Sequence, residues 1–119
     1  METKTSGNTG EVLAENFLKK KGYLVLERNF STKIGEIDLI CRDKDYIVFV
    51  EVKTRDASTL ISPKEAVTPA KQSKIKKTAL AYLSAIEKEM NVRYDVIEVM
   101  VYQTGIKKVK IHHIPGAFI

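Results

Sequence analysis

Hydrophobic and polar positions alternate with two different periods along the chain. Between residues 10 and 21 the apolar side chains recur every three or four positions, which predicts an amphipathic helix that ends at Gly22. Three stretches rich in β-branched and aromatic residues follow, at residues 23–29, 35–42 and 46–54. The first half of the chain is therefore expected to form one helix and three consecutive strands.

The second half begins with a long connection at residues 55–67, which lacks clear periodicity and is expected to be a functional or mobile loop. Thr68 and Pro69 then combine an N-cap with proline at the first helical position, and helical spacing continues to about residue 89. Two strands at 94–102 and 109–113 and a docked apolar tail at 114–119 complete the prediction. The predicted order is α-β-β-β-α-β-β, an α/β fold with about five strands.

Length and composition fit one globular domain that spans residues 1–119. The single cysteine, Cys41, excludes an internal disulfide and a CxxC-type zinc site, and it favours a reducing compartment. No stretch approaches the ~18 consecutive apolar residues of a membrane span, and the first eight residues are polar rather than signal-like. We therefore expect no membrane association and a cytoplasmic location.

Charged residues interrupt the most apolar of the predicted strands, at residues 46–54. Because strand side chains alternate between faces, Glu51 and Lys53 lie on the same face, roughly 7 Å from each other. A strand this apolar is expected to be central, where a charged group is costly unless it is paired or binds a metal. Glu51 and Lys53 therefore need a compensating partner, unless they form a simple ion pair on a solvated face.

Asp38 is the candidate partner, because it interrupts the apolar run of the preceding strand. A two-residue turn at Lys44 and Asp45 would pair Asp38 with Glu51, with Cβ atoms roughly 5 Å apart. A three-residue loop would shift the register by one residue and send the two carboxylates to opposite faces. Convergence of the carboxylates therefore requires the two-residue turn or a bulge.

Two carboxylates at that distance repel each other unless a cation lies between them. Their hard oxygen atoms, with no histidine or cysteine nearby, favour Mg²⁺ or Mn²⁺ over zinc. Such an ion would polarise a phosphoryl oxygen and lower the pKa of a bound water, while Lys53 would hold the water or stabilise charge on the phosphate. Asp38 and Glu51 are therefore the candidate metal ligands for phosphodiester hydrolysis.

Further charged residues lie where they could serve such a site. Glu11 is at the rim of the first helix's buried face and can look towards the sheet, although the helix macrodipole also favours a carboxylate there. Residues 53–77 hold seven basic and two acidic residues, which together account for the whole net charge of +5. Arg55, Lys71 and Lys74 are the expected nucleic-acid contacts in this segment, unless the lysines only solvate a helix face.

Two pairs near the C-terminus carry weaker signals. Arg93 and Asp95 share one face of a predicted strand, where they either form an ion pair or contact a nucleotide backbone. His112 and His113 are adjacent on a strand and therefore point to opposite faces, so they cannot form one site by themselves. Both histidines are expected at the surface.

The spacing of Asp38 and the later Glu51-Val52-Lys53 resembles the PD-(D/E)xK motif of restriction-endonuclease-like nucleases. A longer set of residues resembles, more specifically and over essentially the whole chain, the YraN-like family of uncharacterised bacterial proteins. That set comprises Gly7, Gly10-Glu11, Ala14, Gly22-Tyr23, Arg28-Asn29, the run from Gly35 to Ile40, the run from Phe49 to Arg55, Pro63, Glu65-Ala66-Val67, Lys71, the run from Arg93 to Val96, and Ala117-Phe118. Two departures are Ile37, in place of the motif's proline, and Ile61-Ser62, where a glycine is expected before Pro63.

The resemblance implies a restriction-endonuclease-like mixed sheet flanked by helices, with Mg²⁺ (or Mn²⁺) bound through Asp38 and Glu51. It implies that Lys53 is the catalytic lysine and Glu11 an auxiliary acid, and it places the chain near archaeal Holliday-junction resolvases. The leading hypothesis is a metal-dependent DNA endonuclease that selects its substrate by structure. A homodimer would offer two symmetry-related basic surfaces to two duplex arms.

Two alternatives remain open at the level of sequence. A nucleic-acid-binding module of the same fold, with little or no catalytic activity, would supply DNA to a protein partner in repair or uptake. That alternative keeps Arg55, Lys71 and Lys74 important and makes both carboxylates dispensable. A structural protein that assembles through its sheet edge or apolar tail would leave the carboxylates within strands without a purpose.

Overall fold

The computed structural model describes residues 5–56, 67–86, 89–104 and 106–119. The elements, in chain order, are α1 (Thr5–Lys20), β1 (Leu24–Ser31), β2 (Glu36–Asp43), β3 (Tyr46–Asp56), α3 (Pro69–Ala85), β4 (Asn91–Thr104) and β5 (Ile106–Phe118). This is the predicted order, α-β-β-β-α-β-β, and the predicted α/β class is confirmed. Thr68 caps α3 through its hydroxyl, which accepts from the backbone N–H of Lys71, and Pro69 follows at the start of the helix.

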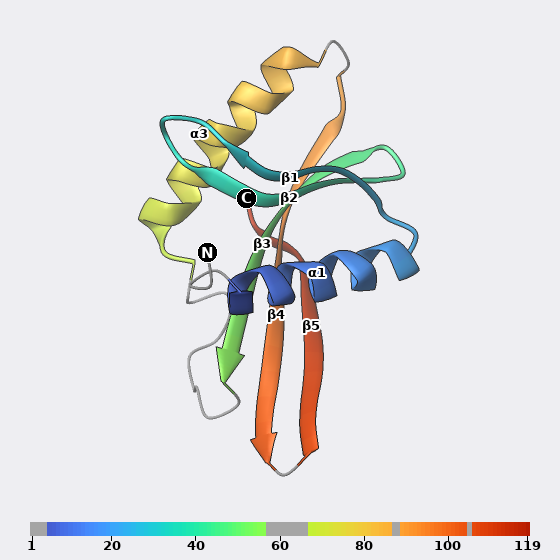
Figure 1. Cartoon of the computed structure of the whole chain (residues 1–119). Coiled ribbons are helices and arrows are strands. Elements are labelled where there is room, and N and C mark those ends of the chain that lie inside the picture. Colours follow the sequence, from blue (N-terminus) through green and yellow to red (C-terminus); the bar gives the residue numbers. More distant parts are fainter. Residues whose placement is uncertain (1–4, 57–66, 87–88, 105) are drawn as a thin grey trace.

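The five strands form one mixed sheet in the order β1-β2-β3-β4-β5 (Figure 1). All neighbouring pairs are antiparallel except β3 and β4, which run parallel because α3 carries the chain back between them. The predicted β2–β3 hairpin is confirmed, because Asp43 pairs with Tyr46 across the two-residue turn at Lys44 and Asp45. Lys44 has a positive φ of 58°, as such tight hairpin turns require.

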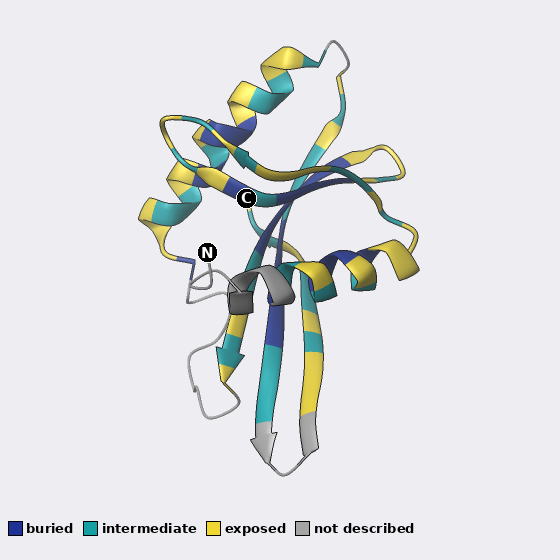
Figure 2. Ribbon diagram, viewed as in Figure 1, coloured by how far each residue is buried: buried dark blue, intermediate teal, exposed yellow. Residues whose placement is uncertain are grey.

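The sheet is covered by α1 on one face and by α3 on the other. Ala14 and Leu18 of α1 pack with the inward side chains of one face, and Ile75 and Ala79 of α3 pack with those of the opposite face. Figure 2 shows that the buried residues gather along the central strands β2, β3 and β4, between the two helices. In the part of the chain that the structure describes, no helix has the length and apolarity needed to cross a membrane.

Several predicted boundaries are wrong: the first helix begins at Thr5 rather than at residue 10, β4 begins at Asn91 rather than at 94, and β5 begins at Ile106 rather than at 109. The helix α3 ends at Ala85, not near residue 89, because Ile86 is already extended with φ −99° and ψ 143°. The tail 114–119 does not merely dock: β5 continues through it to Phe118, which pairs with Tyr94 and stacks on its ring. Within the predicted connection 55–67, residues 55–56 end β3, and residues 57–66, which include Pro63 and Ile61-Ser62, lie outside the described residues.

A buried charge network joins β4, β5 and the segment after α1. Asp95, with no exposed surface, accepts hydrogen bonds from the Arg93 side chain at 2.9 and 3.0 Å, from His113 Nε2 at 2.7 Å and from the Gly116 N–H at 3.0 Å. The Arg93 guanidinium also donates to the Tyr23 hydroxyl. The Arg93–Asp95 pair is therefore structural, and the prediction of a surface His113 is wrong, because its side chain is only 2% exposed. His112 is exposed, as predicted.

Candidate functional site

The strand β2 changes its inward-facing side at Asp38. Leu39 packs with the α1 side, whereas Ile37 packs with the α3 side, although residues two apart on a regular strand share a face. The pairing passes from Arg28 with Leu39 to Phe30 with Ile37, and the residues between them are Asn29 and Asp38. Asn29 has a φ of 52°, a left-handed conformation that asparagine tolerates, and this backbone turn accounts for the change of side.

Asp38 lies where the β2–β3 ladder stops. The register extends from Asp43 with Tyr46 as far as Leu39 with Val50. The register predicted for a two-residue turn is therefore confirmed, and its continuation sets Asp38 opposite Glu51. In place of a further backbone pair, Asp38 Oδ2 accepts a hydrogen bond of 2.8 Å from the N–H of Val52. The carboxylate of Asp38 is thereby held in the gap between the diverging strands, beside Glu51.

Glu51 lies on the α3 side of β3, on the face where Phe49 is buried, and is itself 7% exposed. Its Oε2 atom lies 2.7 Å from Lys71 Nζ and 3.5 Å from Lys53 Nζ. The first contact is made because α3 begins directly over this end of β3, while the second follows from the two-residue spacing along the strand. Glu51 is therefore buried between two ammonium groups.

The electrostatics of the site show an excess of carboxylates around Asp38. Burial, followed by the negative charge of Glu51, raises the pKa of Asp38 to about 7, against the opposing hydrogen bond from Val52; the charges of Glu11 and Glu36 raise it further. Burial and the neighbouring Lys71 lower the pKa of Lys53. A divalent cation would relieve the repulsion between Asp38 and Glu51.

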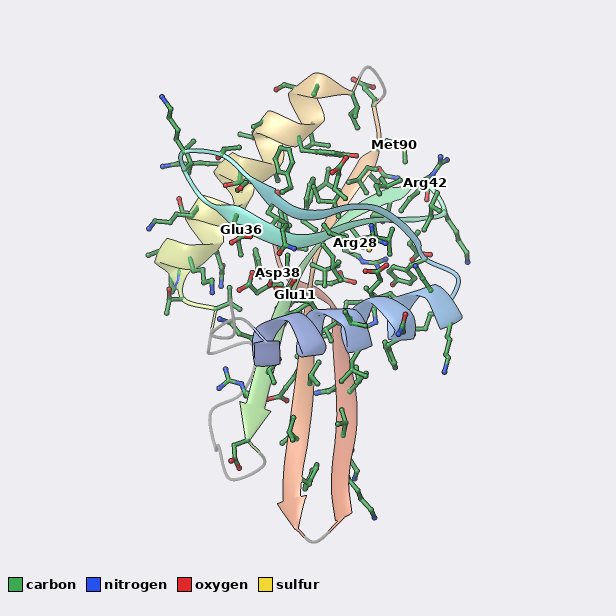
Figure 3. The ribbon with its side chains drawn as sticks, in the orientation of Figure 1. Glu11, Arg28, Glu36, Asp38, Arg42 and Met90 are labelled. Carbon is green, nitrogen blue, oxygen red and sulfur yellow. The ribbon has the colours of Figure 1, made fainter. Side chains whose placement is uncertain are left out.

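Glu11 approaches this cluster from the opposite face of the sheet. Figure 3 shows its side chain reaching from α1 towards Asp38, with Glu36 on the other side of that carboxylate. The helix comes this close because Gly10 lies against β3: a Cβ atom at Gly10 would fall 2.0 Å from the Thr54 hydroxyl oxygen. The structure therefore brings together Asp38, Glu51 and Lys53, with Glu11 at their edge.

The three predicted nucleic-acid contacts have different surroundings. Lys74 is exposed, and Lys71 is half-buried with its ammonium on Glu51. Arg55 is turned inward: its side chain is 13% exposed, and Nε lies 3.2 Å from Oε2 of the buried Glu98, outside hydrogen-bonding geometry. Of these three residues, Lys74 alone is exposed and takes part in none of the ion pairs found among the described residues.

The sequence profile of the uncharacterised protein family UPF0102 matches residues 10–99, three quarters of the chain. The chain belongs to this family. Its match confirms the YraN-like resemblance, and the matched span includes Glu11, Asp38, Glu51 and Lys53. The match assigns the chain to a family and assigns it no activity.

Similar UPF0102 proteins align along most of their own length. One from Syntrophomonas wolfei is 49% identical over 113 residues, which cover 94% of this chain and 96% of the relative. One from Caldanaerobacter subterraneus is 47% identical over 116 residues, covering 97% and 95%, and one from Clostridium botulinum is 50% identical over 99 residues, covering 82% and 80%. These relatives therefore match at least four fifths of this chain.

The contribution of Asn29 to the candidate site was not predicted, although an asparagine inside an otherwise β-prone stretch is a usable signal of a turn. We predict that Asn29→Val destabilises the fold by about 1–2 kcal/mol, because a β-branched residue resists positive φ. Asn29→Gly should leave stability close to that of the unaltered protein. Urea unfolding of both variants checks this, and equal stability of the two would contradict it.

The raised pKa of Asp38 gives a second prediction, for the metal-free protein in EDTA. Because the folded pKa of about 7 lies above the ordinary value of 3.8, ionisation of Asp38 opposes folding; the penalty is absent below about pH 4 and complete above pH 7. Asp38→Asn keeps an acceptor for the Val52 N–H and removes the charge. The variant should match the unaltered protein at pH 4 and exceed its free energy of unfolding at pH 9 by at most about 4 kcal/mol. Equal stabilities at pH 9 in urea unfolding would contradict this.

Proposed function

We propose that this UPF0102 protein is a metal-dependent endonuclease that hydrolyses phosphodiester bonds in DNA. The observation that carries the proposal is the meeting of Asp38 and Glu51 at the end of the β2–β3 ladder, with Lys53 beside Glu51. These side chains place a half-buried carboxylate, a buried carboxylate and a lysine, from two neighbouring strands, at one point of the sheet. They supply both the anionic oxygens and the cation that phosphodiester cleavage uses.

The donor set fits a magnesium-like ion. Among the described residues no group of three or more histidine, cysteine, aspartate or glutamate side chains is close enough to hold a metal by itself. Mg²⁺, however, is commonly bound through one or two carboxylates, with water and substrate phosphate completing its coordination. Asp38 and Glu51 would hold the ion, which would polarise the phosphoryl oxygen and lower the pKa of the attacking water.

The lysines of the site have distinct tasks in this proposal. Lys53 holds its ammonium next to Glu51, where it orients the attacking water or stabilises negative charge on the phosphate. Lys71 neutralises Glu51 at 2.7 Å in the protein alone, and its half-exposed ammonium is free to turn to a substrate phosphate once another cation occupies the carboxylates. Glu11, from α1, adds a further carboxylate near Asp38.

The test is cleavage of labelled linear, flapped and four-way-junction DNA in Mg²⁺, Mn²⁺ or EDTA. The proposal expects fragments in Mg²⁺ or Mn²⁺ and none in EDTA, and preference among the three DNAs would begin to define the substrate. Intact DNA of all three kinds with either metal would overturn the proposal.

One observation favours the second candidate, a nucleic-acid-binding module with little hydrolysis. Lys71 and Lys53 already neutralise Glu51 without any metal, so the charges of β3 can be compensated within the chain. Binding of the same DNAs without cutting would support this candidate.

A further inference from the structure

The strands β4 and β5 extend well past α1 as an arm, here defined as residues 98–104 and 106–112 (Figure 1). At the base of the arm β3 still pairs with β4, as far as Asp56 opposite Val101, and beyond that point the arm is two-stranded. The register along the arm is regular, with Glu98 opposite His112 and Met100 opposite Lys110. Figure 2 shows that burial falls along the arm, from buried residues at its base to intermediate and exposed ones further out. The outer arm is thus a surface feature that core packing does not require.

Charged and apolar side chains are separated between the two faces of the arm. Ile111 and Val99 pack with the α1 side of the sheet, and Val101 and Val109 follow them by alternation on the same face. The opposite face carries the exposed residues Lys108, Lys110 and His112, and Lys110 lies 5.8 Å over the ring of Tyr102. Among the arm residues whose side chains the structure describes, the exposed charges of β5 therefore all lie on this second face, beside Met100 and Tyr102 of β4.

The face of the arm that carries Lys108 and Lys110 is on the same side of the sheet as the candidate site. Glu51 and Lys53 face the α3 side, and Lys53 pairs with Glu98, which in turn pairs with His112. The helix α3 starts beside Glu51 and runs over the opposite half of the sheet, so α3 itself does not cover this face of the arm (Figure 1). The carboxylate of Glu51 and the lysines of the arm therefore lie on the same side of the sheet.

We propose that Lys108 and Lys110 bind the DNA backbone on one side of the phosphate that the candidate site engages. Their exposed ammonium groups offer the charge complementarity that a phosphate backbone needs, and the acidic residue on this face, Glu98, is buried against Arg55. The inference rests on the proposed function and adds to it a binding surface that lies outside the predicted segment 53–77.

The dimensions of the arm suit a duplex that continues beyond the site. Lys110 and Lys108 lie two and four residues past His112, or roughly 7 and 13 Å along the strand. At about 3.4 Å per base pair, the lysines would meet phosphates about two to four base pairs from the level of Lys53. The arm would thereby contact the duplex that flanks the cleaved phosphate, whereas the few exposed charges at the site itself would not reach it.

The test compares Lys108→Ala/Lys110→Ala with the control Lys20→Ala/Lys44→Ala, which removes the same charge from α1 and from the β2–β3 turn. Binding to a fluorescent duplex is measured by anisotropy in EDTA between 50 and 200 mM salt, after thermal unfolding has shown that all proteins are folded. The slope of log affinity against log salt should fall by about 1.8 in the arm variant and stay unchanged in the control. Over this salt range, the unaltered protein should then lose about tenfold more affinity than the arm variant.

Each outcome decides the inference. The inference is overturned if the arm variant has the same slope of log affinity against log salt as the unaltered protein. This holds also if the arm variant newly self-associates, because the lysines would then only protect the edge strand β5. An unaltered protein that binds no duplex overturns both this inference and the proposed function. An unaltered protein that cuts DNA while the arm variant keeps the full slope overturns the inference alone.

Discussion

Replacing Glu51 with glutamine is expected to lower the rate of metal-dependent DNA cleavage on the order of a thousandfold, equivalent to about 4 kcal/mol of transition-state stabilisation. The substitution keeps the size of the side chain but removes the charge that, with Asp38, would hold the metal. It also leaves Lys71 and Lys53 a neutral amide in place of the carboxylate that pairs with their ammonium groups. Single-turnover cleavage in Mg²⁺ measures the effect, and anisotropy should show DNA binding nearly intact.

Glu98→Gln is the matched control for this experiment. Glu98 is as buried as Glu51, on the same side of the sheet and one strand away, but its partner is Arg55 rather than the Asp38 cluster. The control should cut DNA at a rate close to that of the unaltered protein. Equal rates for Glu51→Gln and the unaltered protein would remove Glu51 from the mechanism.

Replacing Asp95 with asparagine is expected to lower the free energy of unfolding by on the order of 3 kcal/mol, because it removes the fully buried counter-ion of Arg93 and leaves that half-buried guanidinium, among the described residues, with the carboxylate of Asp43 alone, at 3.2 Å. Asparagine can accept at one position only, whereas both Asp95 oxygens accept hydrogen bonds, from Arg93, His113 and Gly116. The loss should appear in urea unfolding at pH 7. An exposed carboxylate, Glu27→Gln, should change stability by less than about 0.5 kcal/mol.

The pH dependence of the same variant provides a check on its cause. Burial alone would raise the pKa of Asp95, but the hydrogen bonds from His113, Arg93 and the Gly116 N–H outweigh it, so the folded pKa is lowered. A lowered carboxyl pKa contributes stability that is present above the ordinary value near 4 and is lost as the pH falls through the folded value. The difference between Asp95→Asn and the unaltered protein should therefore shrink below about pH 4, and a constant difference would contradict an electrostatic origin.

Local patterns were sufficient to predict the centre of the candidate site. Strand alternation alone put Glu51 and Lys53 on one face, and a two-residue turn at Lys44 and Asp45 set the register that brings Asp38 to Glu51. These features depend on short stretches of chain, in which geometry follows from residue type and spacing. The helix and strand order was predictable for the same reason.

Contacts between distant segments were not predictable in this way. The ion pair between Lys71 and Glu51 depends on where α3 crosses the sheet, which neither helical spacing nor charge counting reveals. His113 is buried because Asp95, on the neighbouring strand, provides an acceptor for it. The early end of α3 and the early start of β4 likewise follow from the parallel pairing of Tyr46 with Asn91, a tertiary contact that overrides local helix propensity.

The central claim is that Asp38 and Glu51 together hold a divalent metal at a phosphodiester. The most direct test is a Mn²⁺ titration followed by electron paramagnetic resonance, with and without a phosphorothioate duplex, for the unaltered protein and for Asp38→Asn/Glu51→Gln. The account predicts that the unaltered protein binds Mn²⁺, more tightly with the duplex, and that the double variant loses this binding. Equal Mn²⁺ binding by the two proteins would contradict it.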